Sequence, residues 1–92
     1  MTLIIHHDSQ KQQFSVVVDK LKCYLDYSYE NEKQALNYYH TYVPPALRGR
    51  KIAEEIVTFA LRYAKEQNLK VIPSCLYVKR FLDKHPEFQS LL

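Results

Sequence analysis

The sequence of 92 residues has one glycine, no tryptophan, two cysteines and no long hydrophobic run. A single glycine beside four prolines excludes collagen-like repeats and flexible glycine-rich linkers. No stretch reaches the roughly 18 to 20 consecutive apolar residues of a membrane span. The first residues carry neither the basic segment nor the apolar stretch of a secretory signal. We therefore expect a cytoplasmic protein without a membrane partner.

The two cysteines, Cys23 and Cys75, do not form a CxxC motif and have no neighbouring histidine cluster. This spacing argues against a zinc site, and a disulfide is not expected in a reducing compartment. His6 and His7 are adjacent, so on an extended chain they point to opposite faces and do not form a ligand pair. We expect two free thiols and no metal.

Size and composition predict one domain that spans residues 1–92. The hydrophobic fraction of 47%, with 13% aromatic residues, is enough for one core but not for two. Thirteen Lys and Arg against ten Asp and Glu leave a formal charge of +3. This charge suits an anionic ligand but is smaller than the basic excess of typical nucleic-acid-binding domains.

The first half of the chain alternates apolar and polar residues with the period of two that is typical of half-buried strands. The strands predicted from this pattern are Leu3–Ile5, Gln13–Val18, Leu21–Tyr29 and Ala35–Val43. Strict alternation on the last of them places Leu36, Tyr38, His40 and Tyr42 on one face. Because the connections are short, we expect neighbouring strands to run antiparallel.

The second half of the chain is predicted to be mainly helical. Pro44 and Pro45 end the sheet because neither can donate a ladder hydrogen bond. Apolar residues then recur at helical spacing, at Ile52, Ile56, Phe59, Ala60, Tyr63 and Ala64, and Asn68 is suited to close this helix. A strand over Lys70–Ile72 and a helix over Cys75–Lys84, capped by Ser74, follow. The predicted fold class is α+β, a mostly antiparallel sheet of about five strands with a long central helix and a shorter C-terminal helix.

The only glycine, Gly49, stands between the end of the sheet and the start of the long helix. Glycine adopts a positive φ without strain and lets the backbone approach a ligand closely. The first N–H groups of a helix lack intrahelical partners and, with the helix dipole, attract anions. Arg48, Arg50 and Lys51 add positive charge. This segment predicts an anion site, for which the alternative is a solvated basic helix start with a turn glycine.

Two separated segments resemble the GCN5-related N-acetyltransferase family. Residues 40–53, HTYVPPALRGRKIA, are similar to its acyl-CoA pyrophosphate loop, with the pattern Arg/Gln-x-x-Gly-x-Gly/Ala, whose ends Arg48 and Ala53 match. Residues 71–78, VIPSCLYV, resemble the V-x-P-x-C-x-Y/F-V stretch of a subgroup of very short members, in which an HT-x-V-P element precedes the loop. The likeness runs from about Leu3 to Leu91.

The resemblance implies acetyl-CoA, or CoA, as co-substrate. It implies that the fourth and fifth strands splay apart, that pantetheine lies along Tyr42 and Val43, and that backbone N–H groups cradle the pyrophosphate. The cradle would consist of Arg48, Gly49, Arg50, Lys51, Ile52 and Ala53. Lys51 stands where the family pattern has its middle glycine. Its side chain would either crowd the pyrophosphate, which would weaken CoA binding, or swing outward so that the ammonium contacts a phosphate.

Two residues are candidates for catalysis. Acyl transfer from a thioester needs a deprotonated acceptor, donors for the oxyanion and an acid for the thiolate. In the short subgroup a cysteine lies at the place of Cys75, near the thioester, where it would accept the acyl group or protonate the thiolate. His40, on the fourth strand beside the expected gap, would be the general base. The alternatives are a buried packing thiol for Cys75 and a histidine hydrogen-bonded within the sheet for His40.

The implied function is transfer of an acetyl group from acetyl-CoA to an unidentified amine, on a small molecule or a protein. A first alternative is a CoA or acyl-CoA binder or sensor without turnover, suggested by Lys51 and by the shortness of the chain. A second is a nucleic-acid or protein interaction module. Its basis is the set of eight tyrosines, but no RNA-binding motif accompanies them. We expect a monomer or a weak dimer.

Overall fold

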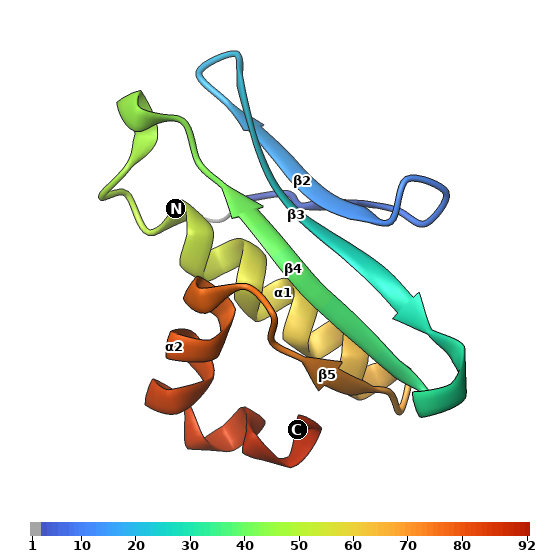
Figure 1. Cartoon of the computed structure of the whole chain (residues 1–92). Helices are drawn as coiled ribbons and strands as arrows, with labels where there is room; N and C mark the ends of the chain where they lie inside the picture. Colours follow the sequence, from blue (N-terminus) through green and yellow to red (C-terminus); the bar gives the residue numbers. More distant parts are fainter. Residues whose placement is uncertain (1–2) are drawn as a thin grey trace.

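The computed structural model describes residues 3–92 as an α+β fold (Figure 1). Its main elements are the strands β1 (His6–Asp8), β2 (Gln13–Val18), β3 (Leu21–Glu30), β4 (Ala35–Tyr42) and β5 (Lys70–Ile72), and the helices α1 (Ile52–Glu66) and α2 (Leu76–Lys84). Three short 3₁₀ turns, η1 (Asn31–Lys33), η2 (Pro45–Leu47) and η3 (Pro86–Leu91), complete the description. Among the residues described, no helix has the length and hydropathy needed to cross a membrane.

The five strands form one sheet in the order β1-β2-β3-β4-β5. The first four run antiparallel to their neighbours, whereas β5 pairs parallel to β4 because α1 forms the crossover between them. Asp19 and Lys20, both with positive φ, form the tight turn between β2 and β3. The sheet is therefore mixed, although most of its pairs are antiparallel as predicted.

Most of the predicted strands are confirmed, two of them (β2 and β5) with the expected ends. The prediction for the first strand is wrong, because β1 spans His6–Asp8 and not Leu3–Ile5. The backbone N–H of Leu3 donates to Oε1 of Glu55 on α1, at 3.4 Å, and not to a neighbouring strand. Leu3 and Ile5 pack against the core without joining the ladder.

A β-bulge interrupts β4 at Tyr39. Tyr38 pairs with Tyr27 and His40 pairs with Asp26, so Tyr39 has no partner on β3. One extra residue reverses the alternation of side chains that follow it. The prediction that His40 and Tyr42 share a face with Leu36 and Tyr38 is therefore wrong.

Helix α1 packs on one face of the sheet, where Phe14, Leu25 and Tyr38 are fully buried. The Tyr38 hydroxyl donates a hydrogen bond to the carbonyl oxygen of Ala60 in this helix. Asn68, with φ of 57°, ends α1 in the left-handed conformation as predicted. The buried side chains and the Tyr38 hydrogen bond fix α1 against the sheet.

Helix α2 lies next to α1, beyond the β5 edge of the sheet (Figure 1), and buries Val78, Phe81 and Leu82. The predicted N-cap, Ser74, is wrong, because Cys75 occupies that position. Cys75 has an extended conformation, and its N–H donates to the carbonyl of Tyr38 at 2.9 Å. The strand-like pairing thus continues up to Cys75 and delays the start of the helix.

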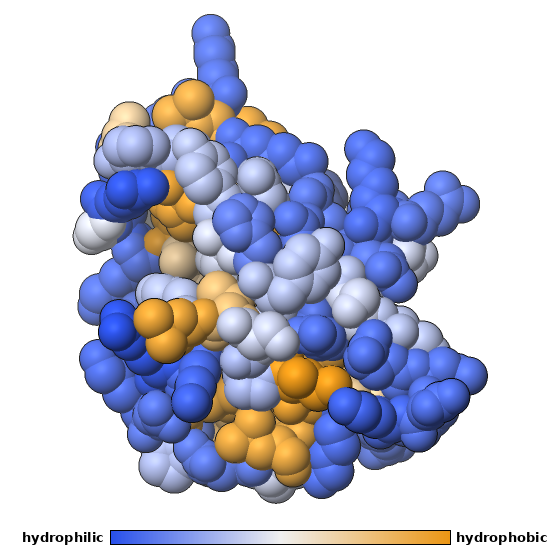
Figure 2. Space-filling model, viewed as in Figure 1, coloured by the Kyte–Doolittle hydropathy of each residue, from blue (hydrophilic) through white to orange (hydrophobic). Residues whose placement is uncertain are grey.

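No helix of the described chain covers the other face of the sheet, which we call the open face. Of its side chains on β2, β3 and β4, only Ala35 is buried. The half-buried and exposed residues are Gln13, Ser15, Val17, Lys22, Tyr24, Asp26, Ser28, Glu30, Asn37, His40 and Tyr42. Figure 2, viewed with the strands in front of α1, shows a mostly hydrophilic surface with apolar patches low in the view, near α2 and η3.

Candidate functional site

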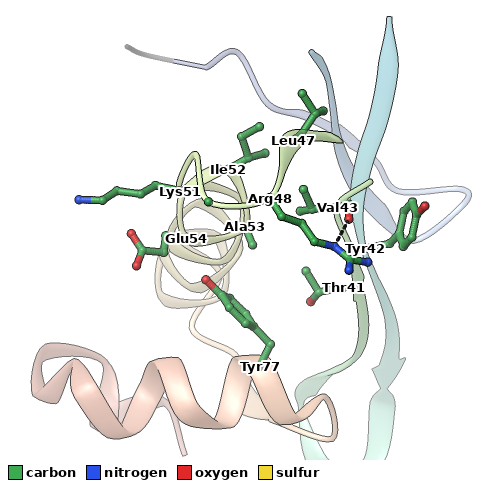
Figure 3. A pocket seen from close by; sticks show the side chains of 11 residues that line it. Thr41, Tyr42, Val43, Leu47, Arg48, Lys51, Ile52, Ala53, Glu54 and Tyr77 are labelled. Carbon is green, nitrogen blue, oxygen red and sulfur yellow. Dashed lines mark hydrogen bonds between the residues drawn. The ribbon is translucent and has the colours of Figure 1, made fainter. Parts of the chain in front are cut away.

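A cavity of about 430 Å³ opens where β4 ends and α1 begins (Figure 3). The end of β4, the following loop, the first turn of α1 and one side chain of α2 form its walls. The lining residues are Thr41, Tyr42, Val43, Leu47, Arg48, Gly49, Lys51, Ile52, Ala53, Glu54 and Tyr77. Its volume lies within the roughly 300 to 1,000 Å³ of typical small-molecule sites.

All of the residues predicted to hold CoA line this cavity except Arg50. The Arg50 guanidinium instead forms an exposed ion pair with Asp19, with an N–O distance of 2.9 Å. It also borders a second cavity, of about 330 Å³, beside the N-terminus of α1. Tyr42 borders the main cavity although its ring points to the open face, where it packs 5.5 Å from the ring of Tyr24 (Figure 3).

The prediction did not include Thr41, Leu47, Glu54 and Tyr77. Leu47 and Glu54 flank the predicted loop directly, and Tyr77 follows Cys75 by two positions, so a wider window around both motifs would have found them. Thr41 belongs to the HT-x-V-P element, but the alternating pattern did not predict that its side chain faces the cavity, because the bulge decides this orientation.

Backbone donors face the cavity at the start of α1. The N-cap Lys51 has a φ of 63°, and none of the side chains that the structure describes caps the helix. The N–H groups of Ile52, Ala53 and Glu54 therefore lack intrahelical partners and lie at the positive end of the helix dipole. Gly49 has a φ of 87°, as predicted, and nothing lies within 4 Å of the place where a Cβ would stand. This geometry suits a phosphate group.

Lys51 does not block the cavity. Figure 3 shows its side chain extending away from the space between α1 and β4, so the ammonium lies outside. Its left-handed backbone conformation is the one that a glycine would adopt without strain. The side chain thus points outward, as in the second alternative, and its contact with a phosphate stays a prediction.

Beyond Tyr38, no strand of residues 3–92 lies beside the outer edge of β4. Pairing with β5 ends at Asn37 and Ile72, and the N–H of Cys75 makes the next contact, to the carbonyl of Tyr38. The Val43 carbonyl points to this edge and accepts a hydrogen bond from Nε of Arg48 at 3.1 Å (Figure 3). We call the space along this edge the β4–β5 gap. An unpaired strand edge of this kind can bind an extended ligand.

The structure places the two predicted catalytic residues apart. Cys75 is half-buried, and its Sγ lies 3.6 Å from Oγ1 of Thr41, which lines the cavity. His40 is exposed on the open face, and its ring lies 5.8 Å from the ring of Tyr24. The thiol and the imidazole thus approach the β4–β5 gap from opposite faces of the sheet.

Tyr77 of α2 also lines the cavity, opposite Glu54 (Figure 3). Burial raises the pKa of its hydroxyl, and the nearby Glu54 carboxylate raises it further. The hydroxyl therefore keeps its proton at neutral pH. Tyr77 can donate a hydrogen bond, or a proton, to a group bound in the cavity.

The described side chains do not form a set of metal ligands at this site. Among residues 3–92, no three His, Cys, Asp or Glu side chains gather in a way that could hold a metal ion. The chemistry that the cavity offers comes from backbone donors, Tyr77 and the neighbouring thiol.

The comparisons with known proteins agree with this geometry. Residues 13–91 match the model of a family described as GCN5-related N-acetyl-transferase. Protein NATD1 of Danio rerio is 34% identical over 91 residues, covering 97% of this chain and 82% of the relative, and NATD1 of Homo sapiens is 33% identical, covering 95% and 78%. The NMR structure of a GCN5-like protein from Staphylococcus aureus aligns with a TM-score of 0.75 and 25% identity, covering 97% of this chain and 86% of that one.

Proposed function

Because the chain belongs to the GCN5-related N-acetyltransferase family, we propose that it transfers an acetyl group from acetyl-CoA to an amine. One observation carries this proposal. The unpaired N–H groups at the start of α1 and the unpaired edge of β4 border the same cavity. A ligand with a diphosphate at one end and an extended amide-containing arm at the other matches both features.

In the proposed complex, the pyrophosphate accepts hydrogen bonds from the backbone between Gly49 and Ala53. Arg48 and Lys51 contribute positive charge, whereas Arg50 contributes mainly its backbone N–H because Asp19 pairs with its guanidinium. The pantetheine arm lies along Tyr42 and Val43 and carries the thioester into the β4–β5 gap. No metal takes part in the proposed chemistry.

The proposed reaction begins when His40 takes a proton from the ammonium form of the acceptor. The amine nitrogen then bonds to the thioester carbonyl carbon, the C–S bond breaks, and the CoA thiolate is protonated. The Tyr77 hydroxyl, which faces the cavity, is placed to supply that proton. In a second form of the mechanism, the Cys75 thiol supplies the proton to the CoA thiolate. In a third, the Cys75 sulfur first accepts the acetyl group and then passes it to the amine.

A second candidate function is CoA or acyl-CoA binding without turnover. It is favoured by one observation, the separation of Cys75 and His40 on the two faces of the sheet. We also propose a cytoplasmic location, supported by the free thiols of Cys23 and Cys75, which suit a reducing compartment.

Calorimetric titration with acetyl-CoA tests the binding step. We expect Arg48→Glu to weaken binding about tenfold or more, because a charge at the cavity wall is reversed. Arg62→Glu, an equal charge change at an exposed position of α1, is the matched control and should leave binding unchanged. Absence of acetyl-CoA binding by the wild type at millimolar concentration would refute the proposal.

Thiol release from acetyl-CoA in the presence of added amines separates the two candidates. Continuous release that depends on the amine identifies an enzyme, whereas binding without release identifies a CoA-binding protein. Mass spectrometry after incubation with acetyl-CoA alone reports whether Cys75 carries the acetyl group. The Cys75→Ala variant is the control for this last measurement.

A further inference from the structure

The segment Leu3–Asp8, which ends in β1, lies at the edge of the sheet opposite β5. We call this segment the N-terminal strap. We infer that the strap is a pH-sensitive element, which is closed on the fold while His7 is neutral and is released when His7 binds a proton. This inference concerns the chain without a ligand and does not rest on the proposed function.

The strap can separate from the fold without opening the core. None of its residues is fully buried, and only Leu3, Ile5 and His7 are half-buried. Its sheet pairing is limited to the three residues of β1, whereas β2 also pairs along its whole length with β3. Segments with few buried contacts open at a lower free energy than the whole fold. Release of the strap therefore leaves β2 to β5 and both α-helices in place.

His7 is the side chain that fixes the strap to the helix-covered face of the sheet. Its ring stacks on Phe14 with centroids 4.4 Å apart and meets the edge of the Tyr63 ring of α1 at 4.5 Å. The Tyr27 hydroxyl lies at hydrogen-bond distance from Nε2 of His7. Burial, with smaller contributions from Tyr63 and Asp8, raises the pKa of this hydroxyl to about 12. Tyr27 therefore keeps its proton and donates it in a hydrogen bond to the neutral imidazole.

The surroundings of His7 do not stabilise its charged form. A protonated Nε2 can no longer accept the hydrogen bond from Tyr27. The titratable groups around the ring are the phenols of Tyr27 on β3 and Tyr63 on α1, and the carboxylate of Asp8 on β1 itself. The Asp8 carboxylate accepts two backbone N–H groups of the following turn, and no carboxylate within residues 3–92 forms an ion pair with His7. Burial lowers the pKa of His7 more than Asp8 raises it, so the proton favours the released strap.

The first residue of the strap connects it to the start of α1. The N–H of Leu3 donates to Oε1 of Glu55 at 3.4 Å, and the Leu3 side chain forms one wall of the second cavity, of about 330 Å³. This cavity shares Lys51, Ile52 and Glu54 with the main cavity. Release of the strap therefore removes a wall of the second cavity and frees the Glu55 carboxylate. Acid would in this way change the surroundings of the backbone donors of α1 as well as the edge of the sheet.

The direction of the pH effect follows from proton linkage. In the released strap His7 has its ordinary pKa of 6.5, and in the closed strap its pKa is lower. The closed strap is therefore most stable above pH 6.5, and it loses stability relative to the released strap as the pH falls below 6.5. Each unit of difference between the two pKa values changes the ratio of released to closed chains by at most about tenfold.

The test is amide hydrogen exchange of the full chain by NMR, with each protection factor calculated against the exchange rate of an unfolded amide at the same pH. From pH 7.5 to pH 5.5, we expect the protection of the strap amides to fall about threefold or more, and that of the β3 and β4 amides to change less than twofold. His7→Phe cannot be protonated and should keep its strap protection at both pH values. His85→Phe is the matched control, because His85 also stacks on a phenylalanine, Phe81, but on α2. It should keep the pH dependence of the wild type.

Two further measurements keep the test decisive if His7→Phe does not fold. His7→Gln is uncharged at both pH values and can still accept a hydrogen bond from Tyr27, so its strap should also stay protected. An NMR titration of the His7 ring in the wild type should give a pKa below 6.5. The inference would be overturned by equal strap protection at the two pH values, by an unchanged pH dependence in the His7 variants, or by an equal loss of protection in β3 and β4. A His7 pKa at or above 6.5 would overturn it as well.

Discussion

The Sγ of Cys75 lies 3.6 Å from Oγ1 of Thr41, on the helix-covered side of β4, whereas the preceding residue of this strand, His40, projects from the open side. The two groups cannot act on each other across the strand. A mechanism in which His40 activates the Cys75 thiol is therefore not supported. Each group would act on its own side of a bound thioester.

The two cysteines should differ in reactivity toward iodoacetamide. Cys75 is half-buried next to the cavity, whereas Cys23 is completely buried, and burial raises the pKa of the Cys23 thiol. We expect Cys75 to be alkylated first, and acetyl-CoA to slow its alkylation at least fivefold. Peptide mass spectrometry measures both rates, and Cys75→Ala identifies any background from Cys23. Equal labelling with and without acetyl-CoA would place the cofactor away from Cys75.

Lys51 should affect stability and CoA affinity through different parts of the residue. A non-glycine residue in the left-handed conformation carries roughly 1–2 kcal/mol of strain. Replacing it with glycine removes this strain, but the greater entropy of glycine in the unfolded chain cancels part of the gain in stability. We expect Lys51→Gly to be more stable than Lys51→Ala by about 1 kcal/mol in urea denaturation. Because the ammonium extends away from the cavity, both variants should bind CoA only about two- to fivefold more weakly than the wild type. Tighter binding by the glycine variant alone would show that the Lys51 Cβ crowds the cofactor.

Acid should destabilise the fold through His7. Its ring stacks on Phe14, with centroids 4.4 Å apart, and burial lowers its pKa from the ordinary value of 6.5 more than the neighbouring Asp8 raises it. The unfolded chain therefore binds this proton at a higher pH than the folded chain. The free energy of unfolding should be largest above pH 6.5 and decrease as the pH falls below it.

Urea denaturation across this pH range measures the His7 effect. His7→Phe keeps an aromatic ring against Phe14 but cannot be protonated, so its stability should depend less on pH. His6→Gln, at the exposed neighbouring position, is the control and should keep the pH dependence of the wild type. An unchanged pH dependence in His7→Phe would assign the effect to other groups.

The hydroxyl of Tyr38 should contribute measurably to stability. It is completely buried, and its hydrogen bond to the Ala60 carbonyl joins the sheet to α1. Removing one such bond costs about 1 kcal/mol. Tyr38→Phe should lose this amount in urea denaturation, whereas Tyr39→Phe, at the exposed bulge position, should lose almost nothing. Equal stability of the two variants would mean that the Tyr38 hydroxyl contributes nothing.

Much of the fold could be read from local patterns, because most elements follow regular periods. The alternation in Gln13–Val18 reports which side chains are buried, and the structure agrees. The helical spacing predicts the burial of Ile52, Ile56, Ala60 and Ala64 correctly. It is wrong for Phe59, which is exposed, and it misses Val57 and Leu61, which are buried against the rest of the core. The conformation of the loop before α1 could also be predicted, since Gly49 adopts the positive φ that its position indicates. These features depend on residues close together in the chain.

The wrong predictions concern positions where contacts with residues distant in the sequence determine the local structure. The bulge at Tyr39 depends on pairing with β3 and reverses the face of His40, which no alternating pattern reveals. The start of β1 depends on the contact between Leu3 and Glu55 of α1. The N-cap of α2 depends on the hydrogen bond from Cys75 to Tyr38. In each case a contact across the fold overrides the local preference.

The unpaired edge of β4 also bears on how the free protein behaves at high concentration. Exposed strand edges are templates for pairing with other chains, and proteins usually cover or shorten them. The section beyond Tyr38 has only the Arg48 side chain to occupy the Val43 carbonyl. A bound cofactor would fill this edge, so its presence should protect the chain against aggregation as well as against unfolding.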